Sequence, residues 1–79
     1  MYYKSHFMDV KNKVGSRLKE LRIKKELSQE SLSRASGLDR TYISDVENGR
    51  RNVSIEAIER LLIGIGVSFN YFFNTKEFK

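Results

Sequence analysis

The stretch QESLSRASGLDRTYISDVENGRRN, residues 29–52, contains the features that decide the fold of this 79-residue chain. Two short segments of helical periodicity flank Gly37, and glycine readily takes the left-handed conformation that ends a helix and turns the chain. Ser28 precedes the first segment and Asp39 precedes the second, and both residue types favour helix N-caps. The spacing predicts a helix-turn-helix, with helices over about 29–36 and 40–47.

The apolar residues of the second helix predict which of its faces is exposed. Ile43 and Val46 form a narrow apolar edge that packs inward. A short helix exposed on its other side fits the major groove of DNA, with its N-terminal residues at the base edges. The residues expected to point to solvent are Arg40, Thr41, Ser44 and Asp45.

These outward side chains, together with Tyr42, carry groups that can read base pairs. Arg40 can donate two hydrogen bonds to guanine O6 and N7, and Thr41 can bond a base or contact a thymine methyl group. Tyr42 can place its hydroxyl on a phosphate or its ring against a sugar. Ser44 can reach a base or a phosphate. Asp45 can accept from cytosine N4, or it can repel wrong approaches to the DNA backbone.

A second set of residues is expected to contact phosphates. Gln29 opens the first helix of the unit, and the amide end of a helix attracts anions. A polar, basic loop follows the second helix. Such contacts position a protein on DNA and add salt-sensitive affinity without reading sequence. The expected phosphate contacts are Gln29, Asn48, Arg50, Arg51 and Asn52.

Periodic apolar residues predict three further helices. One runs from about Asp9 to Lys25, a fourth follows Ser54 and a short fifth follows Ser68. Strand-like alternation is not sustained, so we expect an all-α, compact five-helix domain over residues 1–79, with a short flexible tail over about residues 1–8. The expected inward positions outside the 40–47 helix are Val10, Val14, Leu18, Leu21, Leu32, Ala35, Ile55, Ile58, Leu61, Leu62 and Ile65.

Composition narrows the function classes. Fifteen Lys and Arg against ten Asp and Glu give a net charge of +5 and an isoelectric point of about 9.7, which suits nucleic acid but also describes a mildly basic surface. No Cys and a single His leave no metal site, no cofactor is indicated, and no nucleophile–base pair indicates an enzyme. The chain lacks an apolar run of membrane length and a signal peptide, so we expect a cytoplasmic location.

The same stretch resembles the lambda-repressor-like, Xre-type helix-turn-helix family. The resemblance rests on the patterns Q-E-x-L at 29–32, S-G-L at 36–38, Y-I-S at 42–44 and E-N-G at 47–49. Ser33 departs from the alanine that is frequent there, but it is also small. The resemblance implies a lambda-repressor-like fold and sequence-specific DNA binding.

A narrower resemblance is to the controller proteins of restriction–modification systems, carried by LDRTYISDVENGRRN at 38–52. Those proteins are small dimers that activate and repress the expression of a restriction endonuclease and its methyltransferase. The resemblance implies DNA contacts by Arg40, Thr41 and Tyr42, and phosphate contacts by Arg51 and Asn52. Phage-type and orphan repressors, and antitoxins, share parts of this pattern and remain alternatives.

A homodimer is expected because one short helix reads only a few base pairs. Two-fold dimers on inverted repeats extend the site, with recognition helices about 34 Å apart. The apolar C-terminal segment is a candidate interface, although its aromatic residues could instead pack inside the monomer. The expected interface residues are Ile65, Val67, Phe69, Tyr71, Phe72 and Phe73.

Two other kinds of partner are also compatible with the sequence. Glu26 and Glu30 lie near the start of the first helix of the unit, where they form either a solvated face or a contact to RNA polymerase. An RNA-binding or helical interaction module is the alternative from another class. Single-stranded RNA binders usually carry aromatic side chains on a basic platform, whereas the aromatic residues here cluster away from Arg50 and Arg51.

Overall fold

The structure, a computed structural model, describes the backbone of residues 2–78 and the side chains of residues 10–78. No strand occurs within residues 2–78, so the prediction of an all-α, five-helix fold is confirmed. The first helix begins at Tyr2 and not, as predicted, near Asp9. The prediction of a flexible tail over residues 1–8 falls on a segment whose side chains lie outside the described residues. The elements are α1 (Tyr2–Lys24), α2 (Gln29–Ser36), α3 (Arg40–Glu47), α4 (Ile55–Ile65), α5 (Phe69–Phe73) and a final 3-10 turn, η1 (Lys76–Phe78).

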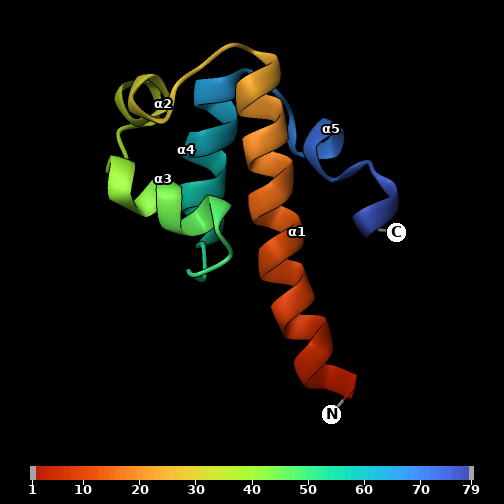
Figure 1. Cartoon of the computed structure of the whole chain (residues 1–79). Coiled ribbons are helices and arrows are strands. Elements are labelled where there is room, and N and C mark those ends of the chain that lie inside the picture. The colour runs from red at the N-terminus through yellow and green to blue at the C-terminus, as the bar shows by residue number, and fades with distance from the viewer. Residues whose placement is uncertain (1, 79) are drawn as a thin grey trace.

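The long helix α1 divides the molecule. Figure 1 shows α2, α3 and α4 on one side of α1, and α5 with the C-terminal turn on the other. α2 packs against α4, and α3 packs against both α1 and α2. The helix-turn-helix is therefore supported from behind by α1 and α4, which leaves one face of α3 outside the core.

Serine side chains begin three of the helices, as predicted. Ser28, Ser54 and Ser68 each accept a hydrogen bond from the backbone N–H three residues further on, at 2.9, 3.0 and 3.0 Å. Asp39 takes the N-cap position of α3, but its carboxylate makes no capping hydrogen bond. Asp39 therefore occupies the predicted N-cap position, but the expectation that its side chain accepts a capping hydrogen bond is wrong.

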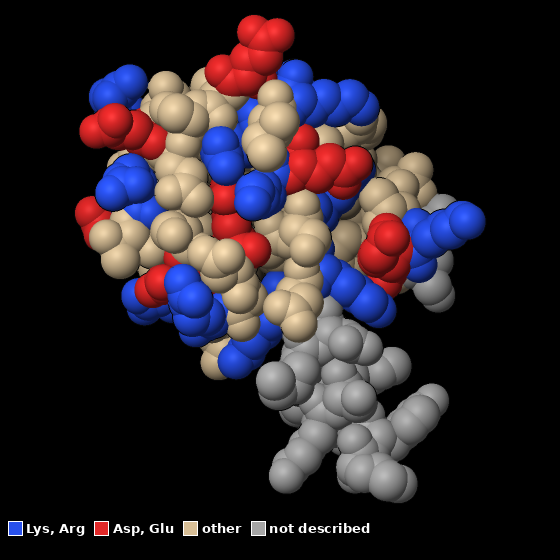
Figure 2. Space-filling model, in the orientation of Figure 1, with Lys and Arg blue, Asp and Glu red and all other residues tan. Residues whose placement is uncertain are grey.

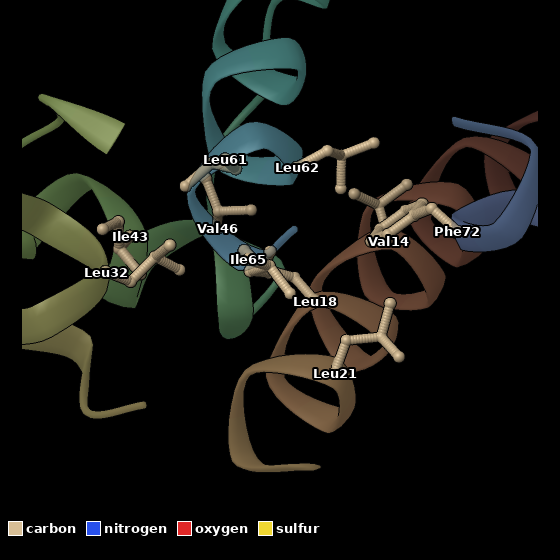
Figure 3. Close-up of a cluster of buried hydrophobic side chains, with 10 residues drawn as sticks. All are labelled: Val14, Leu18, Leu21, Leu32, Ile43, Val46, Leu61, Leu62, Ile65 and Phe72. Atoms are coloured by element: carbon tan, nitrogen blue, oxygen red, sulfur yellow. The ribbon is translucent and has the colours of Figure 1, made fainter. Parts of the chain in front are cut away.

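Ten buried apolar side chains from all five helices form the core, and Figure 3 shows them converging between α1, α3 and α4. Three expected core residues are exposed instead. Val14 is the first buried residue among the described side chains of α1, and Val10 is 49% exposed. Ile55 lies in the first turn of α4, before its buried run, and is 77% exposed. Ala35 faces solvent. The core residues are Val14, Leu18, Leu21, Leu32, Ile43, Val46, Leu61, Leu62, Ile65 and Phe72.

At Gly15 the backbones of α1 and α3 approach each other closely. A Cβ atom added at this position would overlap the backbone carbonyl oxygen of Val46 and lie 2.9 Å from that of Glu47. A residue with a side chain would therefore push α3 away from α1. The close approach fixes the C-terminal end of α3, and with it the start of the loop that follows.

Candidate nucleic-acid interface

The turn between α2 and α3 is held by side chains as well as by its glycine. Gly37 has φ 76°, in the left-handed region that glycine tolerates best. The Ser33 hydroxyl donates to the carbonyl of Leu38, and the Ser36 hydroxyl accepts from the Leu38 N–H at 3.2 Å. Ile43 is fully buried. These contacts set the direction in which α3 leaves the turn.

The two residues that open α3 are available to a ligand. Arg40 is the first residue of the helix, and both Arg40 and Thr41 are exposed. Among residues 10–78, no side chain forms a salt bridge or hydrogen bond with the Arg40 guanidinium. Within this part of the chain, the guanidinium donors of Arg40 are therefore available to a partner.

Tyr42 and Ser44 connect α3 to the loop of residues 48–52, called the basic loop below. The guanidinium carbon of Arg51 lies 4.8 Å from the centroid of the Tyr42 ring, a cation–π contact. The Asn48 amide donates to the Ser44 carbonyl at 2.9 Å. Both residues are half-buried, and the Tyr42 ring and the Ser44 backbone carbonyl hold the basic loop against α3.

Asp45 has partners within the chain. Its carboxylate oxygens lie 3.4 Å from Nη2 of Arg51 and 3.7 Å from Nε of Arg50. The two arginines and Asn52 are otherwise exposed, as expected for phosphate contacts. The arginines expected to bind phosphates are thus close to a negative charge before any DNA arrives.

Gln29 belongs to a buried network that the sequence analysis missed. Glu47 accepts from Nε and Nη2 of Arg22, at 2.6 and 3.1 Å, and its Oε1 also accepts from the Gln29 amide at 3.1 Å. Arg22 and Glu47 are each only 8% exposed. Their positions gave a signal, because each follows a core residue, Leu18 or Ile43, by four residues and therefore shares its helix face.

The comparison with protein families agrees with this geometry. Residues 18–72, which include the turn, α3 and the basic loop, match the family model described as helix-turn-helix. The chain belongs to the helix-turn-helix family.

Two relatives and one solved structure show which branch of the family is similar. The control protein C.MunI of Mycoplasma sp. is 44% identical over 70 residues, covering 87% of this chain and 95% of that protein. The ImmF control region 10 kDa protein of Bacillus phage phi105 is 40% identical over 58 residues, covering 73% of this chain and 64% of that protein.

The solved structure is the restriction–modification controller protein C.Esp1396I, as a tetramer in complex with its natural 35-base-pair operator. It has a TM-score of 0.77 and 41% identity, covering 80% of this chain and 83% of that one. This helix-turn-helix protein is a DNA-binding transcription regulator.

The expected dimer interface of this helix-turn-helix protein is partly wrong. Ile65 is 4% exposed and Phe72 is 1% exposed, so both belong to the monomer core. Phe72 is the buried residue of α5, and its ring packs within the core cluster. Val67 and Phe73 are half-buried against the same core. Phe69 and Tyr71, at 42% and 47% exposed, keep the surface that an interface needs.

The surface of this helix-turn-helix protein mixes both signs of charge. Figure 2 shows Lys and Arg side chains interspersed with Asp and Glu over the face in view. Within the described residues, no group of three or more His, Asp or Glu side chains could hold a metal ion. None of the described helices has the length and apolar character needed to span a membrane.

Proposed function

We propose that this protein is the controller of a restriction–modification operon and binds inverted-repeat operators as a homodimer. The observation that carries the proposal is the exposed start of α3, where Arg40 and Thr41 extend from a helix whose other face is locked into the core. The extent of the match to C.MunI, 95% of that protein, supports the same role for the whole chain.

In this proposal the start of α3 contacts bases, and Gln29 and the basic loop contact phosphates. Arg40 donates two hydrogen bonds to a guanine in the major groove, while Thr41 contacts a neighbouring base. Gln29 and the basic loop bind phosphates on either side and fix the depth of α3 in the groove. Glu47 accepts from one N–H of the Gln29 side-chain amide, so the second N–H of that amide and the uncapped backbone N–H groups of the first turn of α2 can donate to a phosphate.

Dimerisation places two such sites on one duplex. We propose that Phe69 and Tyr71, with the half-buried Val67 and Phe73, form the contact between protomers. A symmetric contact of this kind repeats the same patch on both subunits. The two α3 helices are then expected about 34 Å apart, which is one turn of DNA.

Activation requires a contact beyond DNA. Glu26 and Glu30 are both exposed, on the loop before α2 and in its first turn. We propose that they contact RNA polymerase when the dimer occupies an activating operator. The protein would act in the cytoplasm by binding alone, without catalysis or a cofactor.

Selection from a random pool tests the proposed function. Duplexes that bind the purified protein are enriched, sequenced and footprinted. The expected result is an inverted repeat whose half-sites are centred about one helical turn apart. Enrichment of no sequence, or preferential binding of RNA in direct competition, would contradict the proposal.

A phage-type repressor is the second candidate, favoured by the match to the ImmF control region protein. The two candidates predict the same geometry on DNA and differ in what they regulate. A methyltransferase gene and an endonuclease gene beside the coding sequence, under an operator that the protein binds, are expected for a controller. Neighbouring phage structural genes are expected for a repressor.

A further inference from the structure

Asp45 lies between the recognition helix and the basic loop. Its side chain is 30% exposed, and those of its partners Arg50 and Arg51 are 65% and 46% exposed. All three are therefore in contact with water, on the part of the molecule where phosphates are expected to bind. An ion pair in this setting contributes only about 0–1 kcal/mol, so the arginines can exchange the carboxylate for another anion.

The basic loop does not depend on this carboxylate for its position. The Arg50 backbone N–H donates to the Asp45 backbone carbonyl at 2.9 Å, which any residue at position 45 would retain. The Tyr42 ring supports the Arg51 guanidinium, and the Asn48 amide is bonded to the Ser44 carbonyl. Removal of the Asp45 charge is therefore expected to leave the loop in place.

The carboxylate does change the local charge. Two arginines beside one aspartate carry a net charge of +1, and without the aspartate they carry +2. Binding to DNA gains most of its sequence-independent affinity from the phosphates that cationic side chains neutralise, and each neutralised phosphate makes the affinity more dependent on salt. An aspartate at this place opposes that gain equally on every DNA sequence.

We propose that Asp45 sets the affinity of this protein for DNA by competing with phosphates for Arg50 and Arg51. The inference rests on the proposed DNA-binding function, and it replaces base reading as the role of Asp45. A regulator weakened in this way needs a higher protein concentration to occupy its operator, so the residue at position 45 tunes the threshold at which the operon responds.

The test compares Asp45→Asn with a matched control, Glu20→Gln. Glu20 also pairs with an arginine, at 3.3 Å from Nη1 of Arg17, but it lies on α1 beside the C-terminal segment, away from α3. Both variants gain one unit of positive charge and keep the size of the side chain. Each is titrated against the selected operator and a scrambled duplex between about 50 and 200 mM salt, with thermal unfolding as the check on folding.

The expected result is that Asp45→Asn binds both duplexes roughly three- to tenfold more tightly, with a salt dependence steeper by up to about 0.9 in the log–log slope. Glu20→Gln is expected to stay close to the wild type. Weaker binding of both duplexes would show that Asp45 positions the loop, and a loss confined to the operator would show that it reads a base. Equal gains in both variants would reduce the effect to overall charge, and each of these three results would overturn the proposal.

The same titration separates this inference from the proposed function. If the wild type prefers the operator and Asp45→Asn is no tighter, only the role of Asp45 is overturned. If the wild type binds neither duplex, the DNA-binding function and the role of Asp45 are overturned together.

Discussion

Two carboxylates in the last turn of α3 pair with arginines, and their surroundings differ in almost every physical respect. Glu47 pairs with Arg22 at 2.6 Å, and both residues are buried. Asp45 approaches Arg51 at 3.4 Å and Arg50 at 3.7 Å, where water reaches all three side chains. Since residues two positions apart on a helix point about 200° apart around its axis, Asp45 can face the ligand while Glu47 faces the core.

The difference lies in what each contact can release. The buried pair has given up its hydration, and the carboxylate is satisfied by three donors from α1 and α2. Neither partner can leave without stranding a charge in the interior. The exposed contacts lose little when a phosphate replaces the carboxylate. The first therefore fixes the helix-turn-helix on α1, and the second is free to take part in binding.

The largest expected effect follows from breaking the buried pair. Glu47→Ala leaves the Arg22 guanidinium buried beside a cavity, so the free energy of unfolding should fall by about 3–5 kcal/mol. Urea denaturation followed by circular dichroism measures the change. Asp45→Ala is the matched control and should cost less than about 1 kcal/mol. Similar losses in the two variants would remove the distinction between the two contacts.

A smaller effect is expected when the buried pair is replaced as a whole. The double variant Arg22→Met with Glu47→Leu leaves no unpaired charge, so its unfolding free energy should return to within about 2 kcal/mol of the wild type. Gln29 would then lack the acceptor that holds its amide. DNA affinity should therefore fall by about fivefold even though the fold is recovered.

The double variant is therefore expected to recover its unfolding free energy while its affinity for DNA stays reduced. If stability recovers and the affinity for DNA is unchanged, the network contributes to folding and does not position Gln29. If stability stays as low as in Glu47→Ala, packing around the pair decides the result more than its charge.

The local parts of the structure could be predicted from the sequence. Ser28, Ser54 and Ser68 cap the helices that follow them, because an N-cap depends on residues only three positions apart. Gly37 forms the predicted turn for the same reason. The outward direction of Arg40 followed from Ile43 and Val46. These residues decide most of the helix-turn-helix.

Features that depend on packing between distant segments could not be predicted in the same way. The partner of Arg22 is on α3, 25 residues along the chain, and no local pattern names it. The close approach at Gly15 depends on how α3 crosses α1. The aromatic neighbours of Phe72 favour a dimer interface, but Phe72 itself is 1% exposed and lies in the core. Because the residues around Phe72 are also aromatic, the sequence does not show which of them is buried.

The most direct test of the account compares Arg40→Ala with Arg51→Ala in binding to the selected operator and to a scrambled duplex across a range of salt. Arg40→Ala should lose about 1–3 kcal/mol of discrimination at one base position, with little change in salt dependence. Arg51→Ala should weaken both duplexes alike and make the log–log salt slope shallower by about 1. If both variants keep the wild-type affinity for the operator, α3 and the basic loop are not the DNA-binding surface.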